Sequence, residues 1–144
     1  MRLILDTNVV ISGLLWRGPS ARLIDLAIEQ VVTICVNPFL ADELAEKLAM
    51  PKFASRIAAG GSTPERSTPE TLCEQYLALC ERVPALTIAH TCRDADDDNV
   101  LAAALSARAD LIVSGDGDLR ILRVFEGVSI VNAVDALTML SQRS

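Results

Sequence analysis

Four acidic residues, which lie far apart in the sequence, each have other polar residues nearby in the chain. They are Asp6, Glu43, Asp98 and Asp116, with Asp118 directly after the last of these. Carboxylates that meet in a fold repel one another and raise each other's pKa, and a divalent cation relieves that repulsion. An all-oxygen ligand set favours Mg²⁺ or Mn²⁺ over zinc. Ions of this kind activate water and stabilise an oxyanion, so the pattern predicts metal-dependent phosphodiester hydrolysis.

Further polar residues flank these acids and could orient the ligands from behind. They are Thr7, Asn8, Ser114, Asp94 and Asp97. Each motif also has a simpler interpretation. Asp6-Thr7-Asn8 and Asp116-Gly117-Asp118 could be turns, Glu43 could be a solvated helix residue, and the Asp94–Asp98 run could cap a helix whose dipole favours acids. The combination favours a site more than any one motif does.

The cysteines and the single histidine do not form a zinc motif. Cys35, Cys73, Cys80 and Cys92 contain no CxxC pair, so the usual ligand clusters are missing. His90 and Cys92 could bind a metal together, but two ligands are weak evidence. We expect reduced, mostly buried thiols.

Strand-like and helix-like segments alternate along the chain. We predict short buried strands over Arg2–Leu5, Val31–Val36, Leu86–Ala89, Leu111–Ser114 and Val128–Val131. We predict helices that follow the N-caps Ser20, Asn37, Ser67 or Thr68, and Asn132, the last helix ending near Ser141, and one further helix that Asp98 opens. This alternation favours an α/β fold, with a central parallel sheet covered by helices on both faces.

The predicted topology brings the acids together. Open α/β sheets bind ligands outside the carboxyl ends of their strands. Asp6, Asp116 and Asp118 follow strands and should share that edge. Asp98 joins them if the helix it opens runs antiparallel to the sheet, so that the N-terminus of the helix lies at the same edge.

Length and composition predict a single domain over residues 1–144. The Gly-, Ser- and Pro-containing stretch Ala58–Glu70 is expected to be a mobile loop and not a domain boundary. No apolar stretch is long enough to span a bilayer, and the N-terminus does not resemble a signal peptide. We therefore expect a cytoplasmic protein.

The net charge of −6 argues against a broad basic surface for nucleic acid. Of the 13 basic residues, all but Lys47 and Lys52 are arginine, which suits bidentate phosphate contacts. Arg17, after the first strand, and Arg93, before the acidic run, are expected near the acidic edge. They are candidates for binding RNA, although ordinary surface roles are about as plausible.

Four segments together resemble the PIN-domain ribonucleases, in order and in spacing, over nearly the whole chain. They are LILDTNVVISGLL, NPFLADELAEKL, RDADDDNVLAAALSARADLIVSGDGDL and VSIVNAVDAL. The branch most similar to this chain comprises toxins of bacterial toxin–antitoxin pairs. The resemblance implies a three-layer α/β/α sandwich and Mg²⁺- or Mn²⁺-dependent cleavage of single-stranded RNA.

The resemblance also implies roles for particular residues. Asp6 matches the first family acid, Glu43 the helix-borne glutamate, and Asp98 the acid three residues before Leu101-Ala102. Asp116 matches the position after the fourth strand. Many family members are dimers, and toxin members pair with an antitoxin, so a homodimer and an antitoxin are the expected protein partners.

The sequence lacks residues that the main competing functions require. Haloacid-dehalogenase-type phosphatases need an aspartate where Asn8 stands, and receiver domains need a lysine after a late strand. The P-loop motif is absent. The stronger alternative is a catalytically idle module that keeps the fold and binds RNA or protein. The intact carboxylates count against it, and a metal-dependent cleavage assay distinguishes the two.

Overall fold

The computed structural model describes residues 1–60 and 67–143, and its core is one six-stranded sheet. The spatial order of the strands is β3-β2-β1-β4-β6-β5. The strands are β1 (Arg2–Leu5), β2 (Thr33–Val36), β3 (Glu81–Arg82), β4 (Leu111–Val113), β5 (Val124–Phe125) and β6 (Val128–Val131). Every neighbouring pair is parallel except β5 with β6. The sheet is therefore mostly parallel, as predicted, with one antiparallel strand at its edge.

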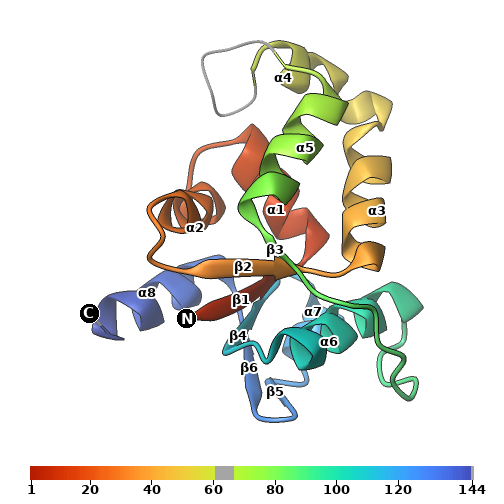
Figure 1. Ribbon diagram of the computed structural model, residues 1–144, viewed down its shortest axis with the longest axis vertical. Coiled ribbons are helices and arrows are strands. Elements are labelled where there is room, and N and C mark those ends of the chain that lie inside the picture. The colour runs from red at the N-terminus through yellow and green to blue at the C-terminus, as the bar shows by residue number, and fades with distance from the viewer. Residues whose placement is uncertain (61–66, 144) are drawn as a thin grey trace.

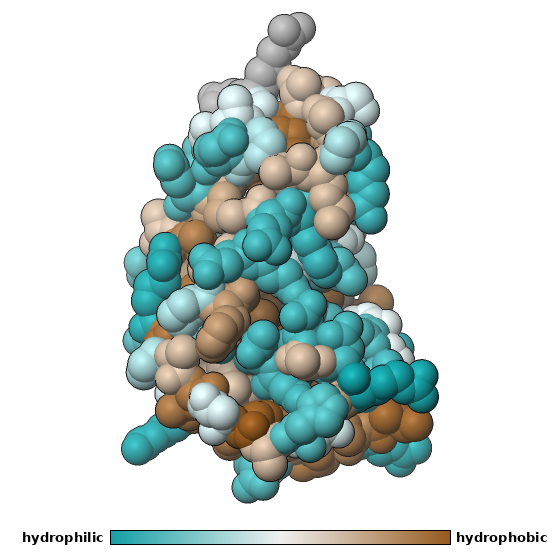
Figure 2. All heavy atoms as spheres, turned by 90° about the vertical axis from the view of Figure 1, so that its right-hand side faces the viewer, coloured by the Kyte–Doolittle hydropathy of each residue, from teal (hydrophilic) through white to brown (hydrophobic). Residues whose placement is uncertain are grey.

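Helices lie on both sides of this sheet (Figure 1). They are α1 (Thr7–Leu15), α2 (Pro19–Ile28), α3 (Pro38–Leu48), α4 (Ala54–Ala58), α5 (Pro69–Leu79), α6 (Ala95–Ala107), α7 (Gly117–Arg120) and α8 (Ala133–Arg143), with a 3₁₀ turn at Pro51–Phe53. The face of the molecule that carries α3 is turned to the viewer in Figure 2, where hydrophilic side chains gather across the middle. No helix among the described residues is long and apolar enough to cross a membrane.

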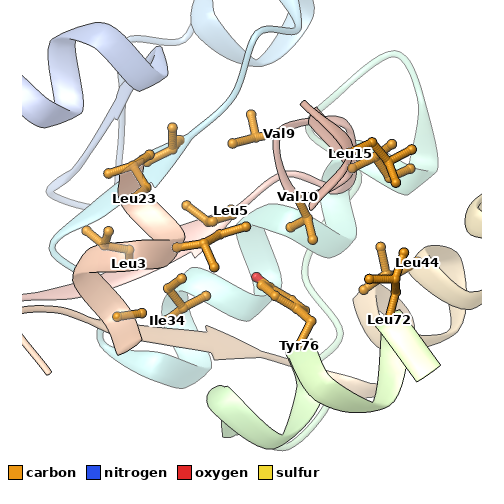
Figure 3. Close-up of a cluster of buried hydrophobic side chains, with 14 of the residues drawn as sticks. Leu3, Leu5, Val9, Val10, Leu15, Leu23, Ile34, Leu44, Leu72 and Tyr76 are labelled. Atoms are coloured by element: carbon orange, nitrogen blue, oxygen red, sulfur yellow. The ribbon is translucent and has the colours of Figure 1, made fainter. Parts of the chain in front are cut away.

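Two hydrophobic cores form because successive side chains of a strand point to opposite faces of the sheet. Leu3 and Leu5 of β1 pack into a cluster with Val10, Leu23 and Tyr76 from the helices of one face (Figure 3). Ile4, between them, packs into a second cluster that includes Leu101 and other apolar residues of α6. The fold is thus a three-layer α/β/α sandwich, as predicted.

Several predicted helix boundaries agree with the structure because their capping residues act locally. The Asn37 side chain accepts a hydrogen bond from the Leu40 amide, and the Thr68 hydroxyl accepts one from the Thr71 amide. The Asn132 side chain accepts one from the Asp135 amide at the start of α8. A proline follows two of these caps, and its fixed φ favours the first helical turn.

The prediction missed helix α1, which starts directly after Asp6. The amides of Val9 and Val10 donate to the Asp6 carbonyl at 2.9 and 3.1 Å, so the helix begins without a side-chain cap. Its β-branched residues have modest helix propensity. Because Val9, Val10 and Ile11 are buried against the sheet, tertiary packing outweighs that propensity.

Other boundaries were also predicted wrongly. Helix α2 begins at Pro19 with Gly18 as its N-cap, so Ser20 is not the cap. No strand forms over Leu86–Ala89, and β3 lies a few residues earlier. Part of the predicted loop Ala58–Glu70 (61–66) lies outside the described residues. The short helix α7 and strand β5 were not predicted.

Helix α6 begins at Ala95, three residues earlier than predicted. Its N-cap is Asp94, whose carboxylate accepts a hydrogen bond from the Asp96 amide at 2.9 Å. Asp98 therefore lies inside the first turns of the helix and does not open it. A helix turns by about 100° per residue, so this shift changes which acid of the run faces the sheet edge.

Candidate metal centre

Asp6 and Ser114 meet where the neighbouring strands β1 and β4 end. The Asp6 amide donates to the Val113 carbonyl at 2.9 Å, which continues the ladder between the strands. The Ser114 hydroxyl donates to the Asp6 carboxylate at 2.8 Å, and both side chains are buried. The parallel register therefore places the first acid beside a hydroxyl that holds its orientation.

Ser114 also connects Asp6 to the acids that follow β4. Its hydroxyl oxygen accepts a hydrogen bond from the Asp116 amide at 2.9 Å. Asp116 is the N-cap of α7, and its carboxylate accepts from the Asp118 amide at 2.8 Å. The Asp-Gly-Asp segment is thus the start of a short helix, and one serine positions the acids at the ends of both strands.

Glu43 reaches the site from α3. The Thr7 hydroxyl donates a hydrogen bond to the Glu43 carboxylate. The start of α3 is held in place by Asn37, whose side-chain amide donates to the Asn99 carbonyl of α6 at 3.2 Å. Asn8, the next residue of α1, accepts a hydrogen bond from the Lys47 ammonium at 3.4 Å. Thr7 and Asn8 therefore lie beside the acids, as expected.

Asp97, and not Asp98, faces the other acids. Carboxylate oxygens of Asp97, Asp116 and Asp118 lie within 4.8 Å of one another. Asp98 accepts hydrogen bonds from the amides of Thr91 and Cys92 at 3.1 and 2.7 Å, and lies 2.6 Å from a ring nitrogen of His90. The structure therefore does not bring Asp98 to the site that the sequence predicted for it. Its carboxylate holds the loop before α6.

A small pocket of about 140 Å³ lies among these side chains. Its lining is almost wholly polar and includes six carboxylates with one ammonium group. The residues that line it are Asp6, Asn8, Glu43, Lys47, Asp94, Asp96, Asp97 and Asp116.

The pKa values of the two most buried acids are raised. Burial, together with the nearby carboxylates of Asp116, Asp6 and Asp94, raises the pKa of Asp97 to about 7. Burial also raises the pKa of Asp6, although the hydrogen bond from Ser114 opposes this. In contrast, the hydrogen bonds from Cys92, Thr91 and His90 outweigh burial at Asp98 and lower its pKa. The pocket thus disfavours the ionised forms of Asp6 and Asp97.

The residues of the pocket fit a divalent cation. One carboxylate oxygen of Asp97 is buried and has no hydrogen-bond partner among the residues that the structure describes. A buried acceptor without a partner is costly, and this one lies in a group of carboxylates with too few cations to neutralise them. Oxygen ligands without histidine or thiolate suit Mg²⁺ or Mn²⁺.

The two arginines predicted to lie near the acids, Arg17 and Arg93, differ from each other in their position relative to the acids. Arg93 immediately precedes Asp94, the N-cap of α6, and is exposed. Arg17 follows the far end of α1, a helix of nine residues that begins at Thr7, directly after Asp6. At 1.5 Å per residue the helix separates Arg17 from Asp6 by roughly 14 Å, so this geometry does not support a role for Arg17 at the acidic edge.

Lys47 and Asp96 also line the pocket, although neither was predicted to be a site residue. Lys47 lies four residues after Glu43, so the helical repeat places both on one face of α3. That spacing was visible in the sequence. Asp96 could not be separated from its acidic neighbours until the start of α6 was known.

Comparisons with known proteins give two findings. Residues 2–118 match the family model of the PIN domain. Among solved structures, the chain is similar to a chain in the crystal structure of VapBC2 from Rickettsia felis, which is bound to a DNA fragment from the VapBC2 promoter. That match has a TM-score of 0.58 and 14% identity, and it covers 92% of this chain and 98% of the other. At this identity it shows a shared fold. A search of curated proteins finds no match.

Proposed function

This chain belongs to the PIN domain family, and we propose that it is a metal-dependent endoribonuclease that cleaves single-stranded RNA. Its sheet edge gathers acids from four elements into one pocket. A bound Mg²⁺ or Mn²⁺ would lower the pKa of a water molecule and stabilise the charge that develops on the phosphate. The alternative, an idle binding module, would have no need of this pocket.

The single observation that carries the proposal is the buried, unpaired oxygen of Asp97 among other carboxylates. We assign Asp97, Asp116 and Asp118, together with Asp6, as the residues that would hold the metal, with Glu43 at the border of the site. Asp97 replaces Asp98 in this assignment because Asp98 is occupied by backbone amides of the preceding loop.

Polar neighbours orient these acids. Ser114 donates to Asp6 and fixes which of its oxygens remains open to the pocket. Thr7 does the same for Glu43. Such supporting hydrogen bonds set the direction of a ligand and its basicity. Asp94 caps α6 and so positions Asp97 three residues later.

The test is cleavage of a mixed RNA pool by the full chain with Mn²⁺, with Mg²⁺, with Zn²⁺ and with EDTA. We expect cleavage with Mn²⁺ or Mg²⁺ that is lost in EDTA and in Asp97→Asn protein. Equal cleavage by wild type and Asp97→Asn would point to a contaminating nuclease. No cleavage by well-folded wild-type protein under any metal would favour the binding-module alternative.

We also propose that the chain is the toxin of a toxin–antitoxin pair, acting in the cytoplasm. The shared fold with a chain of VapBC2 is in keeping with this role. A largely apolar groove of about 420 Å³ between α1, α2 and α5 offers a surface for a protein. Ile28, at its border, is 63% exposed. The test is whether the product of a small neighbouring gene, co-purified with this chain, abolishes its RNA cleavage.

A further inference from the structure

A second groove, of about 470 Å³, lies along α3 near the acidic pocket. The two cavities share Glu43, Lys47 and Asp96 in their linings, so they lie next to each other. The groove lies on the face shown in Figure 2, where hydrophilic side chains gather. Its volume lies in the range of pockets that accept small organic ligands.

One stripe of α3 forms most of the groove. Phe39, Glu43 and Lys47 follow the spacing of four residues that places side chains on one face of a helix, and Met50 lines the groove just beyond the end of α3. Phe39 is 48% exposed, although it is among the largest apolar side chains of the protein. It lies at the start of α3, and Lys47 lies two turns later.

Lys47 is the one cation in the lining of either cavity among the described residues. Its ammonium donates to Asn8 at 3.4 Å, which directs it toward the start of α1. Lys47 lines the acidic pocket as well as the groove. It therefore lies where the groove and the acidic pocket adjoin.

We propose that this groove binds the nucleotide next to the scissile phosphate, with Phe39 stacked on its base and Lys47 on its phosphate. This inference rests on the proposed function and deepens it by assigning a substrate path. Aromatic stacking accepts any base but needs it unpaired, so the groove selects single strands. The path replaces the one through Arg17, which lies at the other end of α1.

The carboxylates that line the groove are compatible with the binding of a nucleotide base. Asp42, Glu46 and Asp96 line it together with Glu43. They would repel a run of phosphates, but they accept hydrogen bonds from the amino and imino groups of bases. Phosphates would then lie only where Lys47 and the metal-neutralised acids offset their charge.

The first test compares the two lysines of the chain. Binding of a fluorescein-labelled, mixed-sequence ten-nucleotide RNA is measured by polarisation with Mg²⁺ over a range of salt. All proteins carry Asp6→Asn so that the RNA stays intact. Lys47→Ala should weaken binding and reduce the salt slope by about one, whereas Lys52→Ala, outside both cavities, should change neither. Equal behaviour of the two alanine variants would overturn the role of Lys47.

The second test concerns Phe39. In the same background, Phe39→Ala should weaken binding by about five-fold or more, the range expected for loss of one base stack, while Phe39→Tyr should retain it. Val134→Ala, a similarly exposed apolar residue on α8, is the control. Binding by Phe39→Ala as tight as by the control would overturn the stacking.

A direct reporter is available because the chain has a single tryptophan, Trp16. In Trp16→Phe/Phe39→Trp protein, the RNA should quench the new fluorescence, and a duplex of the same sequence should not. Absence of quenching on saturating RNA would contradict the path along α3. Cleavage by the wild-type protein is measured in parallel. Cleavage without these binding effects would refute the groove alone, and binding effects without cleavage would refute the nuclease alone.

Discussion

At the scale of single residues, Asp6 is the acid whose position is most closely determined. Asp6→Asn is nearly isosteric and can still accept the hydrogen bond from Ser114, but it removes one negative ligand. We expect cleavage to fall by about 100-fold or more, as when other groups that stabilise charge at an active site are removed. The melting temperature should hold or rise because repulsion within the pocket decreases. Nuclease rate and thermal melting of the same samples check both, and unchanged cleavage would remove Asp6 from the site.

The neighbours Asp97 and Asp98 should behave in opposite ways. Asp97→Asn should abolish cleavage with little loss of stability. Asp98→Ala should leave most cleavage intact but lose the acceptor of the Thr91 and Cys92 amides, which costs about 1–3 kcal/mol of unfolding free energy. Denaturant unfolding and cleavage assays of both variants decide the matter. A stable Asp98→Ala protein without activity would restore Asp98 to the metal centre.

The raised pKa of Asp97 predicts that the stability of the metal-free protein depends on pH. Its pKa is raised from the ordinary 3.8 to about 7 in the folded chain, so the folded state binds its proton more tightly than the unfolded state. The stability that this carboxyl contributes is present at low pH and is lost as the pH rises from about 4 to 7. Melting temperature in EDTA should fall across this range, and less steeply for Asp97→Asn. Equal slopes for the two proteins would contradict the raised pKa.

At the scale of elements, the position of the site depends on the close packing of α1 against α2. A Cβ atom on Gly13 would lie 2.8 Å from the Ser20 carbonyl oxygen and 2.7 Å from Ile24. Because backbone cannot move aside easily, Gly13→Ala should cost about 1–3 kcal/mol of unfolding free energy, as overpacking does elsewhere. Gly115→Ala, whose Cβ would meet nothing within 4 Å, is the control. Denaturant unfolding measures both, and equal stability would show that the two helices can separate without cost.

At the scale of the whole molecule, the pocket couples metal binding to folding. Mn²⁺ or Mg²⁺ should raise the melting temperature more than NaCl of equal ionic strength, because an ion bound only by the native state stabilises it by mass action. The increase should be larger at pH 8 than at pH 6, since ligands must lose their protons to bind a metal. Thermal melting with each salt measures this. Equal stabilisation by NaCl would attribute the effect to screening of the net charge of −6.

The sequence by itself determined the features that depend on local chemistry. Apolar runs of the right length predicted four of the strands, and cap residues such as Asn37, Thr68 and Asn132 predicted three helix starts. The rule that strand ends share an edge predicted that Asp6 and Asp116 would meet. These inferences need only the preferences of a few neighbouring residues and the topology of a parallel sheet.

Only the tertiary structure decided which acids of the run Asp94–Asp98 line the pocket. Four aspartates in five positions can each cap a helix or bind a metal, and the local energies of these choices are similar. The choice of Asp94 as N-cap turns Asp97 inward and leaves Asp98 to bind the loop from Thr91 to Cys92. In the same way, packing against the sheet made α1 a helix, because burial of Val9, Val10 and Ile11 outweighs their weak helix propensity.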